Sequence, residues 1–182
     1  MKRYFLLFCL VVSSQCPASE GTTAKVCEKN LPVYRAARVV DGDTFVATDG
    51  NVKFKVRIAG LDALEISQPL GDSSKALLSD LIAQKDLKID PVGQGLDLYG
   101  RVLAHVSVNG DDVALVLISK GLATYYRPKC EDYPKDQRLY NYDPSGYLAA
   151  EKTAHEKHLG LWGDKKPTLP CEYRRAKKAK EE

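Results

Sequence analysis

The sequence predicts an α+β domain built on a small, five-stranded antiparallel β-barrel, with one helix inserted among the strands and two helices after them. Three observations carry this prediction. Short segments alternate apolar and polar residues, as half-buried strands do. The dipeptides Asp49-Gly50 and Asn109-Gly110 mark tight turns between such segments. Leucine and isoleucine recur at helical spacing in residues 73–84.

The first strands are set apart by turn residues. Residues 35–40 and 44–48 are extended in character and are interrupted by Asp41-Gly42. Residues 51–58 then alternate cleanly, so Arg57 faces away from the apolar side, toward solvent or a cleft. Residues 87–92 and 102–108 predict two further strands.

Three helices are indicated by periodicity and capping residues. The first covers residues 73–84, with Asp72 or Ser73 as its cap. The second covers residues 113–120, after a cap at Asp111 or Asp112, and is stopped by Gly121. The third begins after Asp143, with Pro144 in its first turn, and closes at Gly160. The polar stretch 127–142 is long for a loop, which is typical of a functional or disulfide-pinned excursion.

The ends of the chain predict an exported protein. Residues 1–18 combine two basic residues, a short apolar run and small residues at Cys16 and Ala18, which is the pattern of a signal peptide cleaved after Ala18. We expect a flexible lead-in at 19–32, the domain at 33–164 and a frayed, solvated basic tail at 165–182. The mature form is then secreted or periplasmic, has no membrane span and is a monomer.

Charge and cysteine content narrow the options further. Removing the signal leaves 25 basic and 24 acidic residues, which excludes a uniformly basic surface for polyanions, so basic residues must gather at any nucleic-acid site. Cys27, Cys130 and Cys171 remain, and an oxidising compartment favours one disulfide. Either Cys130 or Cys27 can be the partner of Cys171, and the sequence does not choose between them.

Two close-set carboxylate motifs carry the predicted chemistry, Asp41-Gly42-Asp43-Thr44 and Asp62-Ala63-Leu64-Glu65. Asp43 and Asp62 supply the oxygen ligands that calcium prefers, and the carbonyl of Ala63 can add a third. Glu65 is near enough to orient or deprotonate an attacking water. Either motif alone is more often a pair of ordinary turn aspartates, and it is their joint occurrence with arginines that favours a site.

Arginines and tyrosines complete the pattern. Arg57 lies between the two carboxylate motifs, and Arg101 follows the turn residues Asp97-Leu98-Tyr99-Gly100, so both arginines can grip a phosphate by paired hydrogen bonds. Tyr99, Tyr125 and Tyr126 can cover a base, although half-buried structural tyrosines are at least as common. Carboxylates, a hard cation and arginines together indicate metal-assisted phosphodiester cleavage.

With these residues in place, the chain resembles the staphylococcal (thermonuclease-type) nuclease family over residues 38–162. The resemblance implies a five-stranded OB-fold barrel with three helices, and calcium-dependent endonucleolytic hydrolysis of DNA and RNA that leaves 3′-phosphate ends. By motif position, Asp43 and Asp62 match the calcium ligands, Ala63 the residue lending its carbonyl, Glu65 the general base, and Arg57 and Arg101 the phosphate-binding arginines. Either Tyr125 or Tyr126 can correspond to a nucleotide-contacting tyrosine of the family, and Tyr99 and Tyr126 are the candidates for substrate binding. The matching segments are Val40-Asp41-Gly42-Asp43-Thr44, Val56-Arg57-Ile58-Ala59-Gly60-Leu61-Asp62-Ala63-Leu64-Glu65, Gln68-Pro69, Tyr99-Gly100-Arg101-Val102-Leu103-Ala104, Gly121-Leu122-Ala123 and Gly160-Leu161-Trp162, with a weaker match at Pro170-Cys171-Glu172-Tyr173-Arg174-Arg175.

Three departures from the family pattern bear on activity. Leu64 replaces the proline usual before the glutamate, which is expected to loosen the turn that positions Glu65. Leu98 stands where a basic residue is common, and the insertion 130–142 has no counterpart. Two rival functions follow from the same residues: an OB-fold module that binds nucleic acid without cutting it, and an extracellular domain that calcium merely stabilises.

Overall fold

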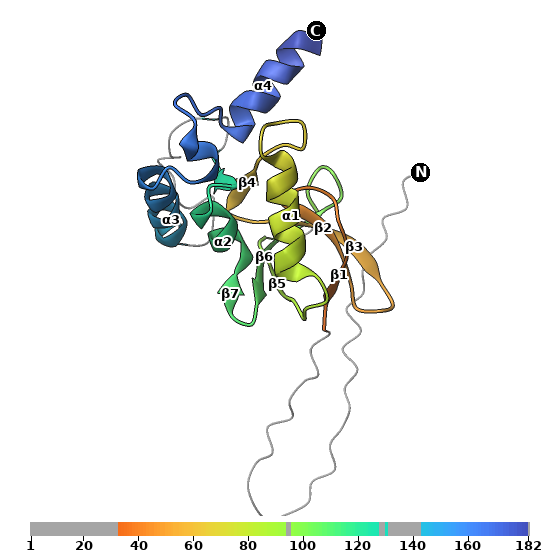
Figure 1. Cartoon of the computed structure of the whole chain (residues 1–182). Coiled ribbons are helices and arrows are strands. Elements are labelled where there is room, and N and C mark those ends of the chain that lie inside the picture. Colours follow the sequence, from red (N-terminus) through yellow and green to blue (C-terminus); the bar gives the residue numbers. More distant parts are fainter. Residues whose placement is uncertain (1–32, 94–95, 128–129, 131–142, 182) are drawn as a thin grey trace, which may run out of the picture. The chain divides into compact units, whose positions relative to one another are not determined.

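The computed structural model describes residues 33–93, 96–127, 130 and 143–181 (Figure 1). The predicted signal peptide 1–18, the lead-in 19–32, Cys27 and most of the insertion 130–142 lie outside the described residues. Everything described belongs to a single contact unit that starts at Pro32 and includes the residues predicted as a tail.

The described strands form a large sheet and a small one. The large sheet has the order β1-β2-β3-β6-β5, and β7 also pairs with β6. A separate two-stranded sheet joins β4 to β8. The bounds are β1 Arg35–Val39, β2 Thr44–Thr48, β3 Lys53–Ile58, β4 Leu61–Ala63, β5 Lys88–Pro91, β6 Val102–Val108, β7 Asp111–Asp112 and β8 Ala123–Tyr125.

Strand pairing corrects two details of the predicted barrel. The β3–β6 pair is parallel, whereas a purely antiparallel barrel was predicted. The edge strands β1 and β5 approach each other at one isolated bridge, Tyr34 with Leu87, where the Leu87 N–H donates to the Tyr34 carbonyl at 2.8 Å. No continuous ladder closes the sheet within the described residues, so the observed architecture is α+β with an open sheet.

In the described part of the chain, four α-helices accompany the strands, where three were predicted. They are α1 Gly71–Ile82, α2 Val113–Ser119, α3 Ser145–Glu156 and α4 Pro170–Glu181, and a 3₁₀ turn, η3, covers Gly160–Gly163. The additional helix is α4, in the segment predicted to be a frayed end. The predicted cap of α1 is also wrong, because the helix starts at Gly71 after Leu70 in a left-handed conformation, with no side-chain cap.

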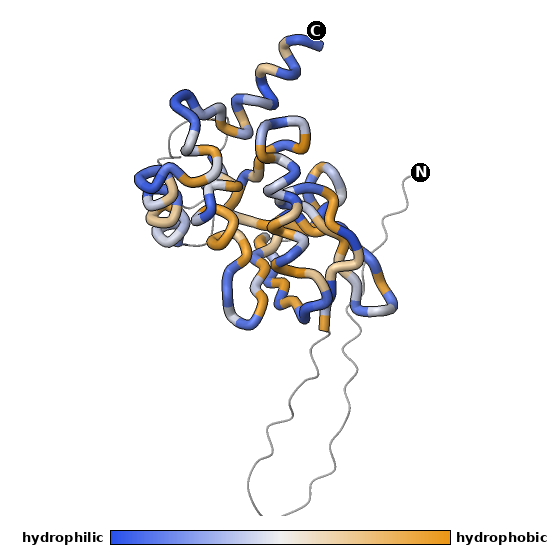
Figure 2. Tube along the Cα trace, viewed as in Figure 1, coloured by the Kyte–Doolittle hydropathy of each residue, from blue (hydrophilic) through white to orange (hydrophobic). Residues whose placement is uncertain are grey.

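The core lies between the large sheet and the helices that cover it. Figure 2 shows hydrophobic residues concentrated along the strands and the facing helices, whereas α4 is mostly hydrophilic. The alternation predicted for residues 51–58 is confirmed from Lys53 onward, since Val56 and Ile58 are buried and Arg57 lies on the opposite face, whereas Val52 precedes the strand and is exposed. Within the described part of the chain, no helix has the length and apolar character needed to cross a bilayer.

Candidate functional site

Asp43 is positioned by the tight turn between β1 and β2. The Asp41 carboxylate closes this turn by accepting the N–H groups of Asp43 at 3.0 Å and Thr44 at 2.8 Å. Gly42 lets the turn approach its neighbours closely, because a Cβ there would lie 2.1 Å from Ser74 Oγ and 2.8 Å from Ala63 Cβ. The Asp43 carboxylate is thereby held against β4, where the Ala63 N–H donates to it at 3.3 Å.

Asp41 itself is a perturbed acid. Burial and the neighbouring Asp43 carboxylate raise the pKa of Asp41 to about 6, although the turn N–H groups of Asp43 and Thr44 act in the opposite direction. The turn therefore gathers negative charge in a partly desolvated position.

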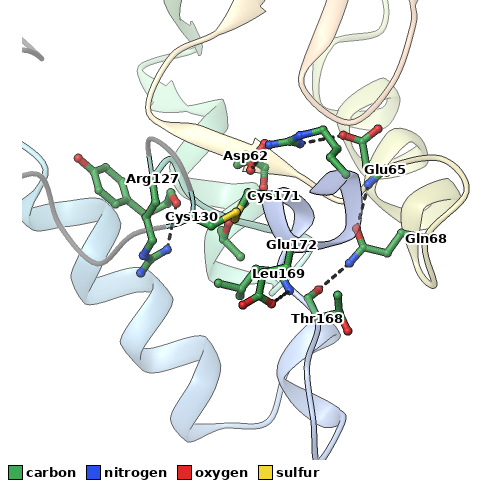
Figure 3. Close-up of a disulfide and its surroundings, with 12 residues drawn as sticks. Asp62, Glu65, Gln68, Arg127, Cys130, Thr168, Leu169, Cys171 and Glu172 are labelled. Atoms are coloured by element: carbon green, nitrogen blue, oxygen red, sulfur yellow. Dashed lines mark hydrogen bonds and ion pairs between the residues drawn. A yellow bond between two sulfur atoms is a disulfide. The ribbon is translucent and has the colours of Figure 1, made fainter. Parts of the chain in front are cut away.

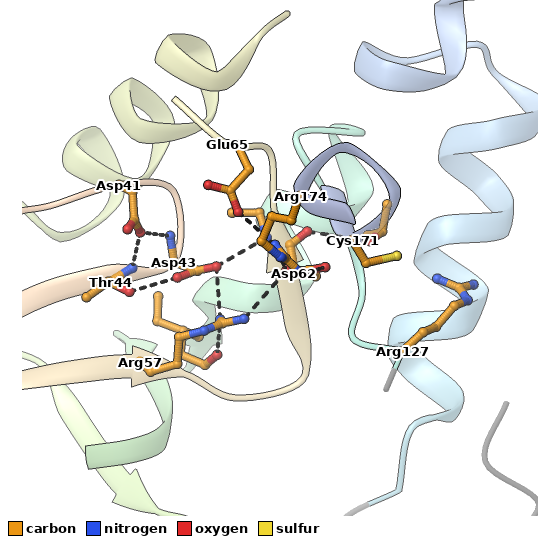
Figure 4. Close-up of polar contacts among 12 residues, drawn as sticks. Asp41, Asp43, Thr44, Arg57, Asp62, Glu65, Arg127, Cys171 and Arg174 are labelled. Carbon is orange, nitrogen blue, oxygen red and sulfur yellow. Dashed lines mark hydrogen bonds and ion pairs between the residues drawn. The ribbon is translucent and has the colours of Figure 1, made fainter. Parts of the chain in front are cut away.

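Arg57 links the two carboxylate motifs. It lies opposite Thr44 in the β2–β3 register, which brings its guanidinium to the β1–β2 turn. One terminal nitrogen lies 3.1 Å from Asp43 Oδ2 and donates to the Ile58 carbonyl at 3.0 Å, and the other lies 3.7 Å from Asp62 Oδ1. Because its side chain is only 12% exposed, Arg57 has a fixed geometry between Asp43 and Asp62 (Figure 4).

Asp62 is the most buried acid of the site, at 2% exposure. It lies in the middle of β4, opposite Thr124 of β8, so both strands of the small sheet hold its backbone. Burial raises the pKa of Asp62 above its ordinary value, and the hydrogen bonds from Arg174 and the nearby charge of Arg57 offset part of this effect. A buried carboxylate of this kind requires a positive partner.

Glu65 follows β4 in a loop with its own supports. Its N–H donates to Gln68 Oε1 at 3.3 Å, and its carbonyl accepts the Gln68 N–H at 2.8 Å. Leu64 is buried, and its N–H faces the Leu122 carbonyl at 3.5 Å, a contact that a proline cannot make. Packing and the Gln68 contacts therefore hold the segment that we expected Leu64 to loosen.

Arg101 joins the site through Thr44. Asp97 organises the preceding turn by accepting the N–H groups of Tyr99 at 2.8 Å and Arg101 at 2.9 Å, and it also accepts from Arg101 Nε at 2.8 Å. The Arg101 guanidinium then donates to Thr44 Oγ1 at 3.2 Å, and Thr44 Oγ1 donates to Asp43 at 2.8 Å. Asp43, Arg57, Asp62 and Arg101, spread over the sequence, thus lie in one connected cluster.

The two predicted substrate-binding tyrosines lie in different settings. Tyr99 is 78% exposed, and its ring lies 5.2 Å from the Arg101 guanidinium carbon, beside the cluster. Tyr126 is half-buried just after β8, with its N–H bonded to the Gly60 carbonyl at 3.0 Å. Tyr125 is buried and stacks on Tyr147, so it belongs to the core. A role for Tyr126 at the site stays a prediction.

Arg174 of α4 is the residue at this site that the sequence analysis missed. Its two terminal nitrogens donate to Asp62 Oδ1 at 2.9 Å and to Asp62 Oδ2 at 2.8 Å, and one of them also donates to Glu65 Oε1 at 2.8 Å (Figure 4). Burial alone lowers the pKa of Arg174, but the bonds to Asp62 and Glu65 outweigh it and raise the pKa above its ordinary value. The weak family match at residues 170–175 was the one signal for this residue.

A disulfide between Cys130 and Cys171 places α4 beside the site (Figure 3). This pairing selects one of the two alternatives that the sequence left open. Three further contacts hold the same end of the helix: Tyr173 donates to the Ser67 carbonyl at 2.6 Å, Gln68 donates to the Thr168 carbonyl at 2.7 Å, and the Leu169 N–H donates to Glu172 at 2.9 Å.

The cluster suits a hard cation. Its donors are oxygens only, from the buried carboxylates of Asp43 and Asp62, which flank the same arginine. The Arg174 guanidinium already stands in for a cation between Asp62 and Glu65. The described residues contain no group of three or more acidic, histidine or cysteine side chains gathered around one metal position, so a bound ion there needs backbone oxygen and water as further ligands.

Comparison with known proteins gives consistent matches. Residues 55–164 match the family described as staphylococcal nuclease homologue. The chain is 35% identical over 158 residues to an uncharacterized endonuclease of Haemophilus influenzae, covering 86% of this chain and 81% of that protein. It is 30% identical over 150 residues to a micrococcal nuclease of Shigella flexneri, covering 78% and 79%. It is also 32% identical over 127 residues to the staphylococcal-like nuclease CAN1 of Arabidopsis thaliana, covering 69% and 35%.

Proposed function

The chain belongs to the staphylococcal nuclease family, and we propose that it is an exported, calcium-dependent endonuclease that cleaves DNA, RNA or both and leaves 3′-phosphate ends. Family membership itself makes the protein a nuclease, a hydrolase of phosphodiester bonds. The cation, the product ends and export are the parts that we add.

One observation carries the proposal. Asp43, Arg57, Asp62, Glu65 and Arg101 come from three segments of the chain and meet in one network of contacts of 2.8 to 3.7 Å, in which Thr44 and Arg174 are the connecting residues. A module that only binds nucleic acid gains nothing from carboxylates beside the phosphate, because like charges repel. Cation-assisted hydrolysis uses every one of these groups.

We assign the cation to the buried carboxylates. Asp43 and Asp62 would hold calcium, with the Ala63 carbonyl as a third oxygen, and the bound ion would stabilise the negative charge that builds on the phosphate. Asp43 is prepared for this role by its turn and by Ala63, and Asp62 by the β4–β8 pair. These supports keep both acids in place when the site is empty of substrate.

The remaining residues act on water and phosphate. Glu65, with 37% of its side chain exposed, can accept a proton from the attacking water. A new bond would form between the water oxygen and phosphorus, and the bond from phosphorus to the 5′-oxygen would break. The departing 5′-oxygen would take a proton from solvent water, so that the phosphate stays on the 3′ side and a 5′-hydroxyl leaves. Arg57 and Arg101 donate to the phosphate oxygens as negative charge grows on them.

Three further expectations belong to the same proposal. A signal-like sequence at residues 1–18 and the Cys130–Cys171 disulfide support a secreted or periplasmic protein, because disulfides persist in oxidising compartments. The strand order and the Tyr34–Leu87 bridge between the sheet edges support an OB-like α+β fold with an open sheet. We propose that the mature protein acts as a monomer.

A digestion experiment tests the function. Protein lacking residues 1–18 is incubated with end-labelled DNA and RNA, with calcium or with chelator, and the product ends are mapped. We expect internal cleavage with calcium only and 3′-phosphate products. Binding of single strands without degradation would instead favour the non-catalytic module, and calcium-dependent melting without degradation would favour a structural domain.

The Glu65→Gln variant tests the role of the proposed base. It keeps the size and hydrogen-bonding reach of the side chain and removes its basicity. We expect an unchanged fold and a turnover lower by about 10²-fold or more. Near-normal turnover in this variant would remove Glu65 from the mechanism.

A further inference from the structure

Arg174 occupies the acidic oxygens that the proposed function assigns to the cation and the base. Both carboxylate oxygens of Asp62 accept from its guanidinium, at 2.9 and 2.8 Å, and Glu65 accepts at 2.8 Å. This is a paired contact of the geometry that makes arginine–carboxylate bonds strong. A divalent cation on Asp62 would compete with the guanidinium for the same lone pairs.

The contact is built into the fold, because three anchors fix the start of α4. The disulfide joins Cys171, three residues before Arg174, to Cys130, which follows β8. Arg127, near Cys130, forms a buried ion pair with Glu151 of α3, so the other end of the disulfide is also tied to the body. Tyr173 and Gln68 bind across the same junction.

The rest of α4 is mostly exposed. Pro170 is its one buried residue among those described, and the residues from Arg174 onward are exposed. The helix buries almost no apolar surface, so polar contacts, among them the anchors and the Arg174 bonds, hold it at the site. An element of this kind can leave the acids without disturbing the core.

We propose that Arg174 is a built-in competitor of the catalytic cation: in the metal-free protein its guanidinium neutralises Asp62 and Glu65, and a divalent cation must displace it to complete the site. The inference rests on the proposed function, since it assumes that Asp62 receives the cation. The disulfide strengthens the competition by keeping Arg174 at a high local concentration beside the acids.

Linkage sets the size of the effect. If the arginine-bound state is favoured by a factor of about 10, the apparent dissociation constant of calcium is raised by about the same factor. Removing the arginine should therefore tighten calcium binding roughly 10-fold. Loss of the disulfide should tighten it by a smaller factor, because the arginine is still present but less confined.

Calorimetric titration with calcium at fixed ionic strength tests the proposal. The variants are Arg174→Gln and, as the matched control, Lys177→Gln, which removes the same charge from an exposed position one turn further along α4. We expect a dissociation constant about 10-fold lower for the first and an unchanged value for the second. The double variant Cys130→Ser with Cys171→Ser should fall between the two.

The outcomes distinguish failure of the Arg174 competition from failure of the proposed cation site. Equal or weaker calcium binding in Arg174→Gln than in the wild type, with binding present in both, overturns the competition and leaves the proposed cation in place. Absence of calcium binding in every variant overturns both, and it locates the failure in the proposed function. An equal gain in Lys177→Gln reduces the effect to general electrostatics and also overturns the proposal.

A second readout uses the unmodified protein, so it does not depend on the folding of a variant. Hydrogen exchange of the amides in α4 is measured with calcium and with chelator. Displacement of Arg174 predicts faster exchange in α4 when calcium is added, because the helix loses its contact with Asp62 and Glu65. Unchanged or slower exchange in α4 at saturating calcium would show that the arginine stays in place, against the proposal.

Discussion

Replacing Gly42 with alanine tests whether the turn between β1 and β2 sets the geometry of the site. The added Cβ would lie 2.8 Å from Ala63 Cβ and 2.1 Å from Ser74 Oγ, whereas ordinary carbon contacts need roughly 3.5 Å or more. Ser74 Oγ can rotate away, but the strand carrying Ala63 cannot, so the turn must move by roughly 1 Å. Asp43 is the next residue and moves with it. We expect a loss of roughly 1–3 kcal/mol in stability and of about 10²-fold in turnover.

The assay combines thermal melting with kcat/KM on a labelled oligonucleotide at saturating calcium. Gly146→Ala is the control, because its Cβ meets nothing within 4 Å and it lies inside α3, where alanine should stabilise by about 0.5–1 kcal/mol. Ser74→Ala in the Gly42→Ala background should restore part of the activity, because it removes the nearest clashing atom. A Gly42→Ala enzyme with wild-type turnover would refute the steric argument.

Three further variants address individual charges. Arg57→Lys should lower turnover at least 10-fold, because one ammonium group cannot reach Asp43, Ile58 and a phosphate together. The control Arg38→Lys, at an exposed position, should have no effect. Equal turnover in Arg57→Lys and the wild type would contradict this prediction. Since the pKa of Asp41 is raised to about 6, the folded metal-free protein retains a proton that the unfolded chain has lost, and stability falls as pH rises from about 4 to 6. Asp41→Asn keeps a hydrogen-bond acceptor in the turn and removes the titrating carboxyl group. In chelator, the stability of this variant should therefore depend less on pH and, allowing for partial exposure, should exceed that of the wild type by about 1 kcal/mol at pH 7. An unchanged pH slope would argue against the raised pKa of Asp41. Arg174→Gln should lower the free energy of unfolding by about 1–2 kcal/mol in chelator and by little in calcium. In this variant Asp62 lacks a close positive partner only when the cation is absent. Equal losses of stability in both buffers would count against that reasoning.

The sequence correctly predicted turns and helix caps whose conformation is set by neighbouring residues. Asp49-Gly50 forms the expected hairpin turn, with Gly50 at φ 97° and the Asp49 carboxylate accepting from Asn51 and Val52. Asp112 caps α2 by accepting the Leu115 N–H at 3.0 Å, as one of the two predicted caps. In each case the residues that decide the conformation are within three positions of one another, so a short stretch of sequence is enough to predict it.

The strands β4 and β8 were missed because they are too short to show a period. Each strand has three residues, all of them buried. Each forms only by pairing with the other, which lies about 60 positions away in the sequence. The predicted start of α1 was wrong for a related reason. A Cβ at Gly71 would lie 1.9 Å from the Glu65 carbonyl oxygen, so the helix begins where the loop after β4 packs against it.

The acids and arginines proposed for catalysis could be picked out from the sequence, but Arg174 could not, and the difference is one of distance along the chain. Asp43, Arg57, Asp62 and Glu65 lie within 23 consecutive residues, and the β2–β3 register brings the turn carrying Asp43 to Arg57. Arg174 reaches Asp62 across 112 positions, through a disulfide and a helix with little apolar surface of its own. Its polar sequence alone is that of a solvated end.

The charges explain why a tail arginine belongs in this site at all. Asp43 and Asp62 flank Arg57, whose nearest contact is with Asp43 at 3.1 Å, while its approach to Asp62 is a longer 3.7 Å. The third acid, Glu65, contacts Arg174. Arg101 is already paired with Asp97. Asp62, almost fully buried, would therefore lack a close positive partner if the tail were absent. Arg174 supplies one positive charge beside Asp62 and Glu65, whereas the divalent cation of the proposed function would supply two. On that proposal, competition between the arginine and the cation is a consequence of burying the carboxylate that receives the metal.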